Sequence, residues 1–289
     1  MRSGQSEGKK ERGGASALLP FLLLLPAVTF VLFLYLYPLV ASIIRSFTVS
    51  GESYSLANYS KAWALYKRDI IFTIEVAILG TLLSTVLGIA LACYVRLSRS
   101  FVARFVNSVS RLAIFLPYVI VGQMMRSFLA PHGFLNVMLA NIGIVDLNSP
   151  IQFFNIKGLL LGFLWKEVPF ISFLLLSALQ VINDCYLEAA RSVGAKTRHV
   201  VMHILIPMIK PAIMIAGVLT FCTIVSTFTL PYMLVTESPT MVTVDIAHRV
   251  TYFRDYGVAN ALGVVLYLLA TPMAVYYLRR TVREAIYGY

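Results

Sequence analysis

The sequence predicts an all-α polytopic membrane protein with six transmembrane helices. Hydrophobic residues make up 59% of the 289 residues and charged residues only 13%, and the mean hydropathy of +0.81 is far above that of a water-soluble protein. Because an open strand would leave its backbone unpaired in lipid, each apolar stretch long enough to cross about 30 Å of hydrocarbon is expected to be a helix. These predicted spans are residues 17–44, 70–95, 112–130, 158–181, 212–235 and 259–278.

The first span is interpreted as an uncleaved membrane helix. Lys9, Lys10 and Arg12 precede it, as the basic residues of a secretory signal do. The apolar run at 17–44 is, however, much longer than the core of a signal peptide, and no small-residue cleavage pattern closes it. Residues 1–16 are therefore expected to form an N-terminal tail, disordered over most of its length.

The distribution of Lys and Arg predicts the orientation of the chain. Fifteen of these residues lie in the two tails, in the connection after the second span, where Arg96 is the first, and in the connection after the fourth span. Seven lie in the other connections. The positive-inside rule then places both termini, including the tail 281–289, in the cytoplasm. Because the net charge of +11 gathers at segment ends and forms no single basic face, nucleic-acid binding is not expected.

Two long connections are expected on the outer side of the membrane. They are residues 45–69 and residues 131–157, and the second is amphipathic and punctuated by Asn and Gly. Either connection could be a docking surface for an external protein or a simple tether, and the sequence leaves both readings open.

The cytoplasmic connection at about 183–210 has a pattern of its own. A short helix is expected over 184–193, where apolar residues recur at helical spacing after an Asn-Asp pair that can cap it. Gly194 is expected to end this helix in a left-handed turn. A second helix is expected to start near Thr197 and to end at Pro207, because proline disfavours helical geometry in the residue before it.

The residues of this loop suit contact with a partner protein, and their spacing resembles a known motif. Small residues let a partner backbone approach closely, and a carboxylate lies near the helix start. The pattern is similar to the EAA loop of the membrane subunits of type I ABC importers, in which a leucine stands where this chain has Ile206. The matching positions, which the resemblance assigns to ATPase coupling, are Glu188, Ala189, Ala190, Gly194, Ile204 and Pro207.

Further stretches resemble the sugar- and polyamine-type permeases of the same family. "WKEVPFISFLLLSALQVI" is similar to their fourth helix, and Asn58 with Tyr59 is similar to their first outer loop. The likeness covers about residues 17–280, so it implies a six-helix permease domain over that range with the type I importer fold. It also implies that the 183–210 loop enters a cleft on a separate ATPase subunit and carries its motion into the membrane.

The resemblance implies a transport subunit and not an enzyme. The expected partners are a second permease subunit, homologous or identical, two ATPase subunits, an extracytoplasmic solute-binding protein and the lipid bilayer. The expected location is the inner membrane of a prokaryotic cell, which the chain crosses several times. No Walker A phosphate loop occurs, and "GAKT" at 194–197 lacks the Gly-Lys adjacency, so this chain is expected to bind no cofactor while its partners use ATP.

The solute is expected to be small and polar, with a sugar or polyol ranked first. "WKEVPF" and "SALQVI" resemble the carbohydrate branch, whereas "AARSVGA" lacks the Asp-Gly pair common in the loops of that branch. A polyamine or another small organic ion is the alternative. An ion-coupled secondary transporter is the rival from a different class, although no duplicated half is visible in the sequence.

Three ionisable residues within the predicted spans are candidates for the solute path: Glu75, Lys166 and Glu167. Such residues are costly in lipid and usually face a bundle interior or water. The alternative is structural: Glu75 would reach the outer interface, while Lys166 and Glu167 would find partners inside the bundle.

Metal binding and catalysis are not expected. His199 and His203 have the spacing of a zinc pair, but Val200 stands where the HExxH motif needs a glutamate. The three cysteines form no paired spacing, so neither a disulfide framework nor a cysteine-ligated metal is indicated. No nucleophile and base pattern is present.

Overall fold

The computed structural model describes residues 15–49, 53–98 and 100–287, and the tail predicted at 1–16 lies outside this range except for its last two residues. Four helices are long and apolar enough to cross a membrane, and two bent helix pairs raise the number to six if each pair is one span. Within the described residues, the only sheet is a small hairpin of β1 (Thr48–Val49) and β2 (Ser53–Tyr54). The predicted all-α membrane fold is confirmed.

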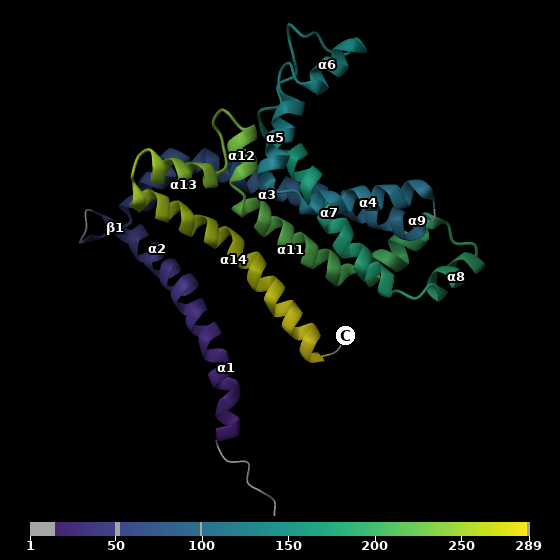
Figure 1. Ribbon diagram of the computed structural model, residues 1–289, viewed down its shortest axis with the longest axis horizontal. Helices are drawn as coiled ribbons and strands as arrows, with labels where there is room; N and C mark the ends of the chain where they lie inside the picture. Colours follow the sequence, from purple (N-terminus) through teal and green to yellow (C-terminus); the bar gives the residue numbers. More distant parts are fainter. Residues whose placement is uncertain (1–14, 50–52, 99, 288–289) are drawn as a thin grey trace, which may run out of the picture.

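The N-terminal span consists of α1 (Ala15–Val31), a π-helical turn η1 (Leu32–Leu36) and α2 (Tyr37–Phe47). The π turn lies just before Pro38, whose ring would collide with a carbonyl of a regular α-helix. Figure 1 shows α1 leading away from the other helices, and its described side chains are exposed. Only the second half of the span therefore packs against the bundle.

The centre of the bundle is formed by α3 (Ala57–Leu97), α7 (Ile156–Val181) and α11 (Lys210–Ser226), which run side by side in Figure 1. At one crossing α3 and α7 approach so closely that a Cβ on Gly88 would lie 2.5 Å from the side chain of Ile171. Small residues allow this kind of approach between membrane helices. The fully buried apolar side chains around the centre include Val76, Leu159, Phe163, Leu175, Leu179 and Ile224.

Two of the predicted spans are broken helices. The third, predicted at 112–130, joins the end of α4 (Phe101–Phe115) to α5 (Tyr118–Leu129), and most of α4 lies in the predicted connection before it. α4 is bent by 113° against α5 and α6 (Phe134–Asn141) taken together. Pro117 at the break keeps Leu116 in an extended conformation. A second bend, of 73°, lies just before the fifth predicted span and separates α11 from the short helices at 197–208.

After α11 the chain forms α12 (Thr229–Leu234) and α13 (Val242–Thr251), so the span predicted at 212–235 is interrupted near Thr227. The sequence did not predict α13, which lies at the opposite end of the bundle from α8 (Cys185–Ser192) in Figure 1. The last helix, α14 (Tyr256–Tyr287), packs beside α2, and the hydroxyl of Ser42 donates to Asn260 Oδ1 at 2.6 Å.

Two boundaries differ from the predictions because polar residues continue a helix beyond its apolar part. α3 begins at Ala57, so residues 57–69 are helical although they were predicted as part of a connection. Its first turns stay packed because Ala62 and Ile70 are buried in a cluster with residues of α13 and α14. α14 continues from the predicted span into the predicted tail 281–289.

Candidate functional site

The predicted loop is present as a helix, a turn and a second helical segment that project from one end of the bundle (Figure 1). The first helix, α8, starts where Asn183 Oδ1 accepts a hydrogen bond from the backbone N–H of Cys185 at 3.0 Å. Leu187 and Ala190 are buried against the bundle, whereas Glu188 and Ala189 are exposed. The helix thus rests on one face and presents the other to a partner.

Gly194 ends α8 in the left-handed conformation that the sequence predicts, with φ of +75°. The N–H of Gly194 donates to the carbonyl of Arg191 at 2.9 Å, and the N–H of Ala195 donates to that of Ala190 at 3.0 Å. This pair of hydrogen bonds is the Schellman ending of a helix, which favours glycine because other residues are strained there. A Cβ at Gly194 would meet nothing within 4 Å, so the space beside the turn is open.

The second segment does not end at Pro207 as predicted. It consists of α9 (Thr197–Val200), a π-helical turn η2 (Val201–Leu205) and α10 (Ile206–Met208). The wider π turn accommodates the proline ring, so the chain stays helical past it. Ile204 is half-buried on the bundle, and Pro207 is exposed.

The exposed side of the loop combines apolar and acidic groups. Val193 is 82% exposed and Tyr186 is 52% exposed, and Glu188 lies between them in the sequence. Exposed aliphatic and aromatic side chains on a protruding helix are typical of a surface that another protein covers. The geometry therefore suits docking, and the coupling role of the six loop residues stays a prediction.

An arginine that the sequence analysis counted only for its charge holds this loop to the bundle. Arg96, in the last turn of α3, donates to the carbonyl of Leu179 at 3.2 Å and to that of Ile182 at 3.1 Å. It also forms a salt bridge with the carboxylate of Asp184, the residue before α8. The sequence does show an arginine at the end of a span, where a cation stabilises the free carbonyls of a helix C-terminus. The partners of this arginine, however, cannot be predicted from spacing along the chain.

Lys166 and Glu167 both have partners inside the bundle. The ammonium of Lys166 donates to the carbonyls of Ala113, Ile114 and Leu116 at 3.1, 2.8 and 2.7 Å, so it satisfies the broken end of α4. Glu167 is buried, and its Oε1 accepts a hydrogen bond from the hydroxyl of Tyr118 at 2.5 Å. Both residues thus brace the break between α4 and α5, and a contact with solute stays a prediction.

Glu75 is not brought together with this pair. Its side chain is exposed on α3, and within the described part of the chain no hydrogen bond or salt bridge links it to Lys166 or Glu167. The three residues therefore do not form one cluster. The side chain of Glu75 lies on the outer surface of the bundle.

A second polar group, which the sequence analysis missed, joins α3 to α13. Asp69 is buried and its Oδ1 accepts the N–H of Thr240 at 2.7 Å, while Thr73 Oγ1 accepts the N–H of Val242 at 3.0 Å. These bonds satisfy backbone donors at the start of α13. No sequence pattern pointed to them because α13 itself was not predicted.

Asp245, on α13, is a buried carboxylate with an oxygen that lacks a hydrogen-bond partner among the described residues. The residue is only 6% exposed, and the oxygen without a partner among them is Oδ2. Burial and the negative charge of Asp69 raise the pKa of Asp245 from 3.8 to about 8, although Arg249 partly offsets them.

An ionic cluster lies beside this group. Lys61 contacts Asp255 Oδ2 at 2.6 Å, and Arg249 lies 3.5 Å from the same oxygen. Partial burial raises the pKa of Asp255, but the hydrogen bond and charge of Lys61, the N–H of Val258 and the charge of Arg249 outweigh it and lower the pKa overall.

The described residues hold no group of three or more His, Cys, Asp and Glu that could bind a metal ion. His199 and His203 stack with ring centroids 5.5 Å apart on the exposed side of the loop. Cys93, Cys185 and Cys222 are free thiols.

Residues 84–285 match the family model described as "Binding-protein-dependent transport system inner membrane component". The chain is 27% identical to the sulfoquinovosyl glycerol transport system permease protein of Agrobacterium fabrum, over 91% of this chain and 90% of the relative. It is 25% identical to the trehalose/maltose transport system permease protein of Thermococcus litoralis, over 91% of this chain and 93% of the relative. It is 30% identical to the spermidine/putrescine transport system permease protein of Escherichia coli, over 57% of this chain and 60% of the relative.

Solved structures show the same fold. A chain of a bacterial ABC transporter involved in the import of the acidic polysaccharide alginate superimposes with a TM-score of 0.80 at 22% identity, over 93% of this chain and 96% of that chain. The alginate transporter in complex with an oligosaccharide-bound periplasmic protein gives 0.79 at 22% identity, over 91% of this chain and 93% of that chain.

Proposed function

The chain belongs to the family of binding-protein-dependent transport system inner membrane components, the permease subunits of ABC importers, and from this membership we propose how its residues take part in import. It is a multi-pass membrane protein and a transport subunit, not an enzyme. Its helices form part of the path for a small polar solute, and ATP hydrolysis takes place in separate subunits that contact the 183–210 loop.

The observation that carries this proposal is the exposed half of the loop. α8 is held to the bundle through Leu187 and Ala190, while Glu188, Ala189 and Val193 face outward beside the open turn at Gly194. A protruding helix with small and acidic residues fits a cleft on another protein. The chain has no phosphate loop of its own, so the energy must come through such a contact.

Three kinds of partner follow from the proposal. The distribution of Lys and Arg supports a cytoplasmic position of the loop and both termini, where two ATPase subunits bind, and an α13 end that faces outward toward a solute-binding protein. A second permease subunit, homologous or identical, covers exposed apolar surface such as the hollow of ≈ 860 Å³ along α5, α6 and α7, lined by Val119, Ile120, Met124, Phe128, Phe134 and Trp165. The assembly lies in the inner membrane of a prokaryotic cell.

The solute is proposed to be a sugar or polyol. Two relatives that match nearly the whole chain are named for glycosidic solutes, and the fold is that of an alginate importer. The polyamine permease matches a shorter part of the chain at slightly higher identity, so a polyamine or another small organic ion is the second candidate.

The test is reconstitution of the complete transporter in proteoliposomes. The chain is co-expressed with its partner permease, ATPase and binding protein, and uptake of labelled trehalose and labelled spermidine is measured with and without ATP inside the vesicles. ATP-dependent uptake of the sugar is expected. Uptake that follows a proton or sodium gradient without ATP would instead support a secondary transporter, and ATP binding by the chain alone would contradict the division of roles.

A further inference from the structure

Arg96 contacts both ends of the junction between α7 and α8. Its Nε donates to the carbonyl of Leu179, in the last turn of α7, and its terminal nitrogen donates to the carbonyl of Ile182, which follows that helix. The same nitrogen pairs with the carboxylate of Asp184, which directly precedes α8. One guanidinium on α3 therefore binds three acceptors on both sides of a short, non-helical junction.

This arrangement uses properties that are particular to arginine. The last carbonyls of a helix have no partner within it, and the planar guanidinium has several donors in a fixed geometry. The Arg96 side chain is only 17% exposed, which favours an ordered, charge-assisted contact. A lysine would offer one ammonium in place of the fork.

Without this contact the direction of α8 would depend on few other groups. Beside Arg96 lies a polar hollow of ≈ 350 Å³, lined by Arg96, Leu97, Asp184, Leu187, Glu188 and Arg191. The lining residues come from the end of α3 and from α8 with the residue before it, and Arg96 and Asp184, which pair with each other, are both among them. Leu187 and Ala190 hold α8 to the bundle, but apolar contacts are not directional.

We propose that Arg96 is a positioning residue for energy coupling: it fixes α8 to the paired ends of α3 and α7, so that a displacement of α8 by the ATPase moves both spans together. The inference rests on the proposed function, because α8 is there the contact with the ATPase. It predicts that loss of Arg96 leaves ATPase binding intact while it separates hydrolysis from transport.

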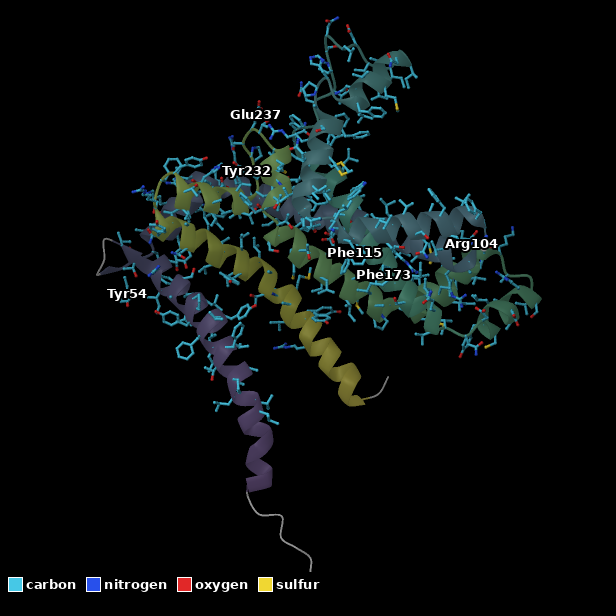
Figure 2. The ribbon with its side chains drawn as sticks, viewed as in Figure 1. Tyr54, Arg104, Phe115, Phe173, Tyr232 and Glu237 are labelled. Atoms are coloured by element: carbon cyan, nitrogen blue, oxygen red, sulfur yellow. The ribbon has the colours of Figure 1, made fainter. Side chains whose placement is uncertain are left out.

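The test is the variant Arg96→Gln in the complete reconstituted transporter. The amount of solute transported per ATP hydrolysed is expected to fall at least fivefold, while the ATPase that co-purifies stays within twofold of the unmodified amount. The matched control is Arg104→Gln, because Arg104 is an exposed arginine near the same end of the bundle (Figure 2), and its side chain has no hydrogen bond or salt bridge within the described residues. The control is expected to keep the unmodified ratio.

A second measurement reports on the position of α8 directly. A nitroxide label is attached to Ser192→Cys, at the exposed end of α8, in a background where Cys93 and Cys222 are replaced by alanine and Cys185 by serine. The label is expected to become more mobile in Arg96→Gln, and to have intermediate mobility in Arg96→Lys. A purely structural defect would instead lower the yield of the assembled complex and leave the transport ratio of the remaining complex unchanged.

The exposed partner gives an independent variant. Asp184→Asn keeps the shape of the side chain and removes its charge at a position that is 57% exposed, so the protein is expected to fold. Transport per ATP is expected to fall at least twofold. Unmodified ratios in both Asp184→Asn and Arg96→Gln, with unchanged label mobility, would overturn the inference and leave the proposed function standing. Absence of ATP-driven uptake by the unmodified complex would instead overturn the proposed function itself.

Discussion

Short helices lie at both ends of the bundle, α8 at one end and α13 at the other, and they are held in opposite ways. α8 is exposed over most of its surface, and it is fixed by two buried side chains, the turn at Gly194 and the contact with Arg96. At α13, the side chains of Asp69 and Thr73 accept backbone donors of residues 240 and 242, while Met241 and Val242 are fully buried.

The comparison indicates different roles: α8 offers a surface for a partner, whereas α13 is part of the packed core. Local stability follows the burial of apolar groups and the protection of hydrogen bonds, and elements that move are drawn from the less stable parts of a protein. Changes in α8 should therefore act mainly on partner binding and transport, whereas changes around α13 should act mainly on stability.

The largest expected effect is that of Gly194→Asp. Most residues other than glycine are strained in this turn by about 1–2 kcal/mol, and Asp tolerates it better than most, so the main effect is the new carboxylate in the open space where a partner must fit. Uptake is expected to fall at least tenfold with the helix bundle still folded. The matched control is Gly143→Asp, because Gly143 has φ of +74° and equally open surroundings outside the loop. If both variants transport normally, the loop is a simple connector.

Glu188→Lys should have the next largest effect. Loss of one partner of a desolvated charge pair at an interface costs about 2–5 kcal/mol, so the ATPase that co-purifies with the chain is expected to decrease at least tenfold. The control is Glu237→Lys, which makes the same charge change on an exposed residue near α12 (Figure 2). Equal co-purification with both variants would remove Glu188 from the contact surface.

Asp69→Ala tests whether the hydrogen bond at the start of α13 contributes to the stability of that helix. The substitution leaves the N–H of Thr240 without its acceptor, which should cost about 1–3 kcal/mol of local stability. Faster hydrogen exchange of the amides from Thr240 into α13 is expected, with unchanged co-purification of the ATPase. Exchange like that of the unmodified protein would show that this hydrogen bond does not hold α13.

The smallest expected effect is a dependence of α13 on pH. The pKa of Asp245 is raised from 3.8 to about 8, so the stabilising contribution of its proton is complete below pH 4 and is lost as the pH rises through 8. Between pH 7 and pH 9 the opening free energy of α13 should fall by about 1 kcal/mol. Hydrogen exchange corrected for its intrinsic pH dependence measures this loss. The variant Asp245→Asn should abolish this pH dependence. A pH-dependent loss that persists in the variant would exclude Asp245 as the titrating group.

The sequence predicted the features that depend on local composition. The length of each apolar run predicted the spans, and the turn at Gly194 was expected because few other residues adopt a left-handed helix ending. The break at Pro117 was not predicted, because the apolar run at 112–130 continues across it, and α4 was missed as a helix because its basic residues made it resemble a connection. The helix α13 was missed because its mixture of polar and apolar residues does not resemble a span.

What the sequence determined by itself was therefore the membrane class and the shape of the α8 turn, since burial in lipid and backbone strain act on each segment alone. Only the tertiary structure decided which polar groups meet. Arg96 and Asp184 are 88 residues apart, and Asp69 and Thr240 are 171 apart. Spacing along the chain cannot predict such pairs, because a buried charge or backbone donor is satisfied by whichever acceptor helix packing brings within about 3 Å of it.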